Sequence, residues 1–232
     1  MKLINIPFFY KKKISLPKGL LQSLPEKIML FTTVQYVKQI PLIKGQLKAK
    51  GKNVFLRQLR HCKEEGQILG CNISRLTGDF DAFLYIGEGE FHPKALIQSN
   101  EKDVFCFNPI SKSYYSLKYN EEASKRRNTG LAKFLISKNV GVLFTIKPGQ
   151  FGNFSLNKLK SKFKDKHFYL FINDTYNFQD LEDFTFVDCF LNTACPRIAY
   201  DDFNSFKKPI ISATEIEQIF NIKKEIKIDQ IS

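Results

Sequence analysis

Features that define several large classes of protein are missing from this sequence of 232 residues. No stretch reaches the roughly 18 apolar residues that a membrane-spanning helix needs. The three lysines at positions 11–13 are followed by only a short apolar segment, so no secretory signal peptide is expected. These absences predict a cytoplasmic protein with no membrane partner. Because that compartment keeps thiols reduced, disulfides are not expected among the five cysteines.

Cysteine pairs with the spacing of common zinc sites are also missing. No Cys-x-x-Cys motif occurs, which argues against a zinc site of the usual kind. Cys62 and Cys71 are nine residues apart, and Cys189 and Cys195 are six apart. Spacing alone therefore favours buried, hydrophobic cysteines at all five positions.

Acidic residues are few compared with basic ones. The chain has 36 Lys or Arg and 23 Asp or Glu, which give a net charge of +13. Between Lys125 and Lys166, eleven basic residues stand against Asp165 alone. Such a surface could attract nucleic acid, an acidic protein or a nucleotide, and the simpler interpretation is a solvated, lysine-rich surface. A basic nucleic-acid-binding module therefore stays open as an alternative function.

Apolar runs alternate with helical stretches, which predicts an α/β protein. The runs are continuously apolar, as expected for parallel strands that are covered on both faces. The expected strands cover residues 27–34, 53–56, 83–86, 103–107, 140–146, 167–172 and 186–191, and the expected helices cover 37–50, 121–137 and 155–165. The length fits two similar domains with parallel sheets flanked by helices. We place them at residues 1–120 and 121–232, with a linker near 116–120.

The loops after these strands are the best places to look for a site, because ligands bind at the carboxyl ends of parallel strands. Cys195 follows the strand at 186–191, and Arg197 lies two residues further on. A permanent cation beside a thiol stabilises the thiolate, the form that binds iron. Cys71 lies next to Gly70 in a loop where a thiolate could face a cofactor. Both cysteines are therefore candidate metal ligands.

The other three cysteines are weaker candidates. Cys106 and Cys189 lie inside apolar runs and are expected to be buried, while the polar flanks of Cys62 leave its role open. A further candidate segment, Gly-Glu-Gly-Glu-Phe-His at 87–92, follows directly on a buried strand. Its two glycines would let a ligand approach the backbone closely.

Five short motifs, taken in order, resemble the iron–sulfur subunit of the diphthamide synthases, the 3-amino-3-carboxypropyl transferases of archaea and eukaryotes. The motifs lie at residues 32–35, 66–72, 85–93, 147–150 and 194–202. The family's fold has three similar α/β domains around a central 4Fe–4S cluster, and each domain gives one cysteine. The resemblance implies that this chain corresponds to the second and third domains, with Cys71 and Cys195 as cluster ligands.

The resemblance also implies a radical enzyme that uses S-adenosylmethionine in the first step of diphthamide synthesis. Its protein substrate is elongation factor 2, which receives a 3-amino-3-carboxypropyl group on one histidine. Arg197, which could pair with the methionine carboxylate, and His92 are the implied catalytic residues. The candidate contacts to S-adenosylmethionine are Gln35, Gly87, Gly89, Gln150 and Asp202.

The family's first domain and its cysteine have no counterpart in this sequence. Two cysteines hold a four-iron cluster poorly. We therefore expect a separate chain that supplies the missing domain and the third cysteine, in a split enzyme that works as a homo- or hetero-oligomer. Alternatively, Cys62 or Cys189 is the third ligand, or the chain is a non-catalytic supporting subunit or a degenerate copy.

Overall fold

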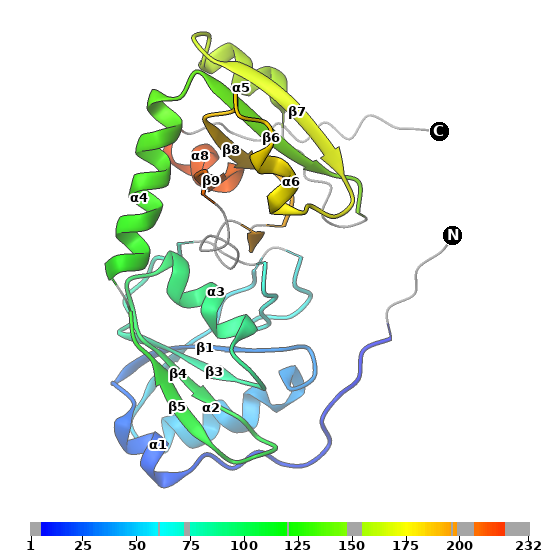
Figure 1. The fold of residues 1–232 in the computed structure, drawn as a ribbon. Helices are drawn as coiled ribbons and strands as arrows, with labels where there is room; N and C mark the ends of the chain where they lie inside the picture. Colours follow the sequence, from blue (N-terminus) through cyan, green and yellow to red (C-terminus); the bar gives the residue numbers. More distant parts are fainter. Residues whose placement is uncertain are drawn as a thin grey trace. The chain divides into compact units, whose positions relative to one another are not determined.

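The protein divides into two compact units, residues 1–120 and 121–232, each built around one sheet (Figure 1). The computed structural model describes residues 6–59, 61–71, 75–119, 121–147, 155–195, 197–198 and 207–220. Both units are mixed α/β structures with parallel-rich sheets flanked by helices, which confirms the predicted fold class. Within those ranges, no helix is both long and apolar enough to span a membrane.

The sheet of the first unit has five strands in the order β2-β1-β3-β4-β5. These strands are β1 (Lys27–Thr32), β2 (Asn53–Phe55), β3 (Ala82–Ile86), β4 (Val104–Phe107) and β5 (Tyr114–Leu117). The first four run parallel, whereas β5 pairs antiparallel with β4. The linker predicted near residues 116–120 therefore overlaps an edge strand, and this sheet is not entirely parallel.

Helices cover both faces of the first sheet. They are α1 (Lys18–Ser23), the 3₁₀ turn η1 (Val37–Gln39), α2 (Ile40–Lys48) and α3 (Phe91–Ser99). α1 and α2 pack on one face through Leu20 and Ile43, and α3 packs on the other through Leu96 (Figure 1). The predicted helix at 37–50 thus begins as a tighter turn, and α1 and α3 are additional helices.

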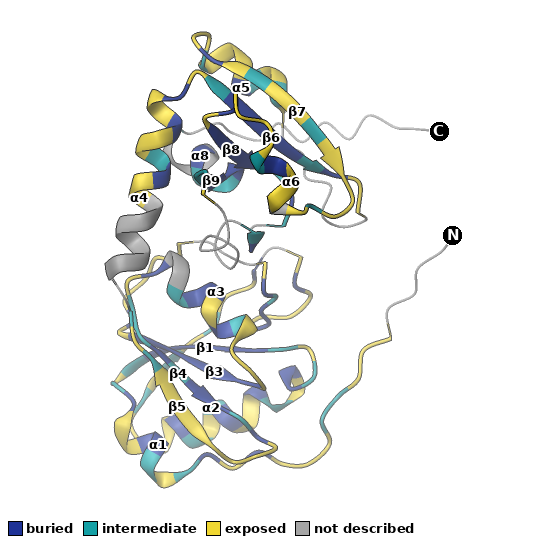
Figure 2. Cartoon of the chain, viewed as in Figure 1, coloured by how far each residue is buried: buried dark blue, intermediate teal, exposed yellow. Residues whose placement is uncertain are grey.

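The second unit has a four-stranded, fully parallel sheet in the order β7-β6-β8-β9. Its strands are β6 (Asn139–Thr145), β7 (His167–Asn173), β8 (Cys189–Asn192) and β9 (Ile210–Ser212), and its helices are α4 (Glu121–Ile136), α5 (Leu156–Lys162), α6 (Phe178–Glu182) and α8 (Ala213–Ile219). α4, α5 and α8 share one core cluster, and α6 packs in the other. Buried residues follow the strands and the inward sides of the helices (Figure 2).

Two local features stabilise the helices of the second unit. Ser155 caps α5 by accepting a hydrogen bond from the Lys158 amide, which confirms the predicted cap. The side chain of Lys166 is only 2% exposed, and its ammonium donates to the carbonyls of Leu135 and Ser137 at 2.8 and 2.6 Å. These carbonyls lie at the end of α4, where no helical partner is available. Lys166 is therefore a structural lysine within the basic stretch at 125–166.

Candidate functional site

The loop that carries Cys71 is fastened to the end of β1. The Thr32 amide donates to the Gly66 carbonyl at 2.7 Å, and the Ile68 amide donates to the Thr32 carbonyl at 2.8 Å. Ile68 is fully buried, whereas Cys71, three residues later, is exposed. The loop thus extends the sheet by one short pairing and then brings a thiol to the surface at the carboxyl end of the strands.

One glycine is required by the shape of this loop, and a second lies in close contact with a neighbouring ring. Gly66 has a φ of +76°, and a Cβ there would lie 2.8 Å from the Ile40 Cδ1 atom. At Gly70 a Cβ would lie 1.9 Å from the ring of Phe91, the first residue of α3. Close contact between Gly70 and Phe91 therefore sets the position of the residue before Cys71. This places the cysteine loop beside the segment that follows β3.

That segment, residues 87–92, is organised by a buried tyrosine at the end of β3. The Tyr85 hydroxyl contacts the Glu88 carbonyl and the His92 Nδ1, each at 3.4 Å. The rings of Tyr85 and His92 are stacked. A Cβ at Gly87 would lie 2.4 Å from the same hydroxyl, so glycine is needed there. Gly89 has a φ of +63° and is exposed. Gly87 therefore lets the backbone pass close over Tyr85, whose hydroxyl also contacts His92.

A second tyrosine joins this segment to the loop after β1. The Tyr36 hydroxyl donates to a Glu88 carboxylate oxygen at 2.7 Å, across 52 positions of sequence. Burial, followed by this hydrogen bond, raises the pKa of Tyr36, so the phenol stays protonated as a donor. Gln35, immediately before Tyr36, is half-buried, and its carbonyl accepts from the Tyr10 amide. The structure thus brings the Gln35 loop and the Gly87–His92 segment together.

Tyr36, Tyr85 and Glu88 were missed as site residues by the sequence analysis. Tyr36 follows directly on the motif at 32–35, and the other two lie within the motif at 85–93. Their position in or beside a motif was the sequence signal that could have marked them as site residues. Only the fold shows that the Tyr36 hydroxyl reaches Glu88.

In the second unit, a buried asparagine shapes the loop that carries Cys195. Asn192 ends β8, and its side-chain amide donates to the Cys195 carbonyl at 2.8 Å. Its side-chain oxygen accepts from the Ala194 amide at 3.0 Å. The Thr193 hydroxyl and amide both donate to the Leu143 carbonyl of β6. Cys195 is consequently held half-exposed at the carboxyl end of this sheet.

Arg197 lies just beyond this turn and is 6% exposed. The Ile198 amide donates back to the Cys195 carbonyl at 3.1 Å, which keeps the segment compact. A guanidinium this well buried needs anionic or carbonyl partners, and its fork suits a carboxylate. Gln150 and Asp202, the other candidates of this unit, lie outside the described residues.

The remaining three cysteines are buried. Cys106 and Cys189 lie in strands β4 and β8, as predicted from their apolar surroundings. Burial and the nearby Cys71 raise the pKa of the Cys62 thiol to about 11, which favours the neutral form. Across the described parts of the chain, no group of three or more His, Cys, Asp or Glu could hold a metal ion. Cys71, which is exposed, and Cys195, which is half-exposed, are the two cysteines that are not buried.

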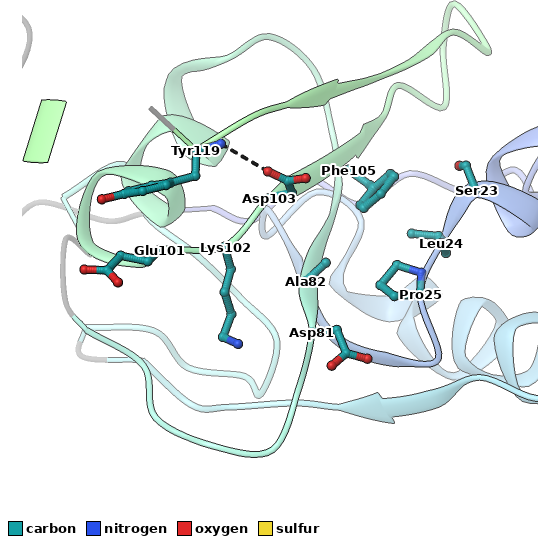
Figure 3. A pocket seen from close by; sticks show the side chains of 10 residues that line it. All are labelled: Ser23, Leu24, Pro25, Asp81, Ala82, Glu101, Lys102, Asp103, Phe105 and Tyr119. Carbon is teal, nitrogen blue, oxygen red and sulfur yellow. Dashed lines mark hydrogen bonds between the residues drawn. The ribbon is translucent and has the colours of Figure 1, made fainter. Parts of the chain in front are cut away.

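A pocket of about 640 Å³ lies at the opposite end of the first sheet, where β3 and β4 begin (Figure 3). Among its lining residues are Asp81, Glu101 and Asp103. Asp103 accepts hydrogen bonds from Lys118 and from the Tyr119 amide, and Asp81 accepts one from the Lys27 amide. Since two of these carboxylates bind the chain itself, and the pocket lies at the end of the sheet opposite the Cys71 loop, we exclude it from the candidate site.

Comparisons with known proteins connect this chain to one family. A family model described as "Putative diphthamide synthesis protein" matches residues 9–232. A 2-(3-amino-3-carboxypropyl)histidine synthase of Pyrococcus horikoshii is 29% identical over 216 residues, which are 92% of this chain and 63% of that protein. Its counterpart in Methanocaldococcus jannaschii is 31% identical over 175 residues, covering 71% of this chain and 49% of that protein.

Two further relatives have names that mention a cofactor or a subunit. The crystal structure of Dph2 from Pyrococcus horikoshii with a 4Fe-4S cluster has a TM-score of 0.66 and 28% identity, covering 92% of this chain and 62% of that chain. A protein of Encephalitozoon cuniculi named subunit 1 of the same synthase is 28% identical over 195 residues, covering 82% of this chain and 55% of that protein. This chain spans 49 to 63% of the length of these relatives. On the match to residues 9–232, the chain belongs to the diphthamide synthesis protein family.

Proposed function

We propose that this chain is part of a 2-(3-amino-3-carboxypropyl)histidine synthase that modifies elongation factor 2 in the first step of diphthamide synthesis. The observation that carries the proposal is the placement of Cys71 and Cys195. Cys71 is exposed and Cys195 half-exposed, each on a loop that is fastened to the carboxyl ends of parallel strands. Parallel sheets bind ligands at that end. The proposed location is the cytoplasm, which keeps both thiols reduced.

The two thiols fit a 4Fe–4S cluster as partial ligands. Cluster iron is bound by thiolates, and Cys71 and Cys195 are exposed and half-exposed, unlike the three buried cysteines. When bound, the cluster supplies the electron that cleaves S-adenosylmethionine. Since the described residues hold no third accessible cysteine, we propose that a partner chain with the family's first domain supplies the remaining ligand.

The chain's own residues would bind and orient the reactants. Arg197 would hold the methionine carboxylate through its two-toothed fork. Gly87 and Gly89 would admit S-adenosylmethionine close to the backbone, with Gln35 at the neighbouring loop. His92, oriented by Tyr85, would exchange a proton with the target histidine. Gln150 and Asp202 are proposed as further contacts from the second unit.

Coexpression tests this proposal. The chain is purified without oxygen, alone and with a candidate first-domain partner, and iron, sulfide, optical and spin-resonance spectra are recorded. We expect about four irons only in the complex, lost in Cys71→Ala and in Cys195→Ala but kept in the matched, buried variant Cys189→Ala. A full cluster in the lone chain would instead favour Cys62 or Cys189 as third ligand.

A supporting subunit without catalysis is the second candidate, because eukaryotic relatives are named subunit 1 and so imply other subunits. Modification of elongation factor 2 that survives loss of Cys71 or Cys195 would favour this role. Failure to bind a cluster under any condition would favour a degenerate copy.

A further inference from the structure

Charge is divided between the two faces of the first unit. The segments that cover the α1/α2 face, residues 6–25 and 33–52, contain nine lysines and no acidic residue. The segments that cover the opposite face, residues 57–81 and 87–103, contain six basic and eight acidic residues. A generally lysine-rich composition would not separate charge in this way. We call the first of these surfaces the lysine layer; its lysines are Lys11, Lys12, Lys13, Lys18, Lys38, Lys44, Lys48, Lys50 and Lys52.

The three consecutive lysines of this layer are held in place from both sides. Before them, the Tyr10 amide donates to the Gln35 carbonyl at 2.8 Å. After them, the Gln46 side chain donates to the Ile14 carbonyl at 2.7 Å and accepts from the Leu16 amide at 2.8 Å. Ile14 and Leu16 are buried in the core beneath. The extended segment is therefore docked beside α2, with all three lysines directed to solvent.

The lysines of the layer are also electrostatically available. Seven of the nine are exposed, and none makes an ion pair within the described residues. Lys52 donates to the Leu24 carbonyl and Lys38 lies over the Phe9 ring, and neither of these contacts supplies a carboxylate as counter-ion. Concentrated positive charge without counter-ions from the protein attracts a polyanion.

The residue types favour RNA over other polyanions. All nine cations are lysines, which contact phosphates as point charges and do not read bases as arginine forks do. Phe8 is 78% exposed next to the lysines and offers a ring on which an unpaired base could stack. A membrane surface fits less well, because the apolar side of α2, with Ile43 and Leu47, is buried in the core.

We propose that the lysine layer is a docking surface for the phosphate backbone of single-stranded RNA. Binding would be independent of base sequence and of both cysteine loops. It is therefore separate from the proposed cluster chemistry, and it needs neither a cluster nor a partner chain.

Fluorescence anisotropy with labelled oligouridine of about 15 nucleotides tests this with the full chain. Counterion release predicts that Lys11→Gln/Lys12→Gln/Lys13→Gln weakens binding by about 100-fold near 0.1 M salt. The negative slope of the logarithm of the association constant against the logarithm of salt concentration should become shallower by about 2. The matched triple variant Lys158→Gln/Lys160→Gln/Lys164→Gln, in the other basic stretch, should bind almost as wild type. Circular dichroism and thermal unfolding confirm that both variants are folded.

Three results would overturn the proposal. Equal weakening in the two triple variants would mean diffuse attraction by net charge. Polyglutamate that displaces the RNA at equal charge concentration would point to an acidic protein surface. Sedimentation with anionic phosphatidylserine vesicles, without any affinity for oligouridine, would identify a membrane surface.

Discussion

The turn around Asn192 makes a quantitative prediction about the Cys195 loop. In Asn192→Leu the side chain keeps its approximate size but loses both of its hydrogen bonds, to the Cys195 carbonyl and from the Ala194 amide. Asn192 is 1% exposed, so water cannot readily replace its amide group. The loop that carries Cys195 should therefore lose its main internal support while the rest of β8 stays paired.

The size of the effect follows from the number of buried bonds. Each hydrogen bond contributes about 1 kcal/mol net, and each buried group left unpaired costs about 1–3 kcal/mol. We expect Asn192→Leu to lower the free energy of unfolding by about 2–4 kcal/mol. If the whole loss falls on the turn, 2 kcal/mol makes local opening about 30-fold more frequent.

Hydrogen exchange at the Ala194 and Ile198 amides measures this opening, and urea unfolding measures global stability. Asn100→Leu is the matched control, because Asn100 is 5% exposed in the first unit and its side chain also accepts from an amide, that of Leu76, and donates to a carbonyl, that of Leu96. It should cost similar stability without faster exchange at Ala194. Equal exchange at Ala194 in both variants, or a loss below about 0.5 kcal/mol for Asn192→Leu, would refute the reasoning.

Three further predictions concern buried charge and the thiols. Lys166→Met should lower the free energy of unfolding by about 2–4 kcal/mol in urea titrations, because two bonds to a charged donor are lost; the exposed control Lys164→Met should change it little. Iodoacetamide at neutral pH should label Cys71 and Cys195 in the native chain, and mass spectrometry showing equal labelling of the buried cysteines would contradict the site. Burial raises the pKa of Cys106 from 9.0 to about 12. The pKa of this thiol is therefore higher in the folded chain than in the unfolded chain. Its contribution to the free energy of unfolding is complete below pH 9 and is lost as the pH rises towards 12. Urea unfolding across this range should therefore show a steeper decline for wild type than for Cys106→Ala.

Much of the fold was readable in the sequence because its signals are local. Continuous apolar runs predicted the central strands β1, β3 and β6, since a strand buried on both faces needs apolar residues throughout. Ser155 before a helical stretch predicted a cap. The edge strand β5 escaped detection because most of its residues are exposed, and its pairing with β4 supplies no sequence pattern of its own.

The candidate site divides in the same way. Sequence motifs alone proposed the loops of Cys71 and Cys195 as candidates, because residues close in sequence form each motif. The contact between Gly70 and Phe91 and the bond from Tyr36 to Glu88 were decided by tertiary structure, since packing onto the sheet brings together residues 21 and 52 positions apart. The lysine layer likewise exists only once α1, α2 and the docked segment share one face of the sheet. Local patterning determined which elements form, and long-range packing determined which side chains meet.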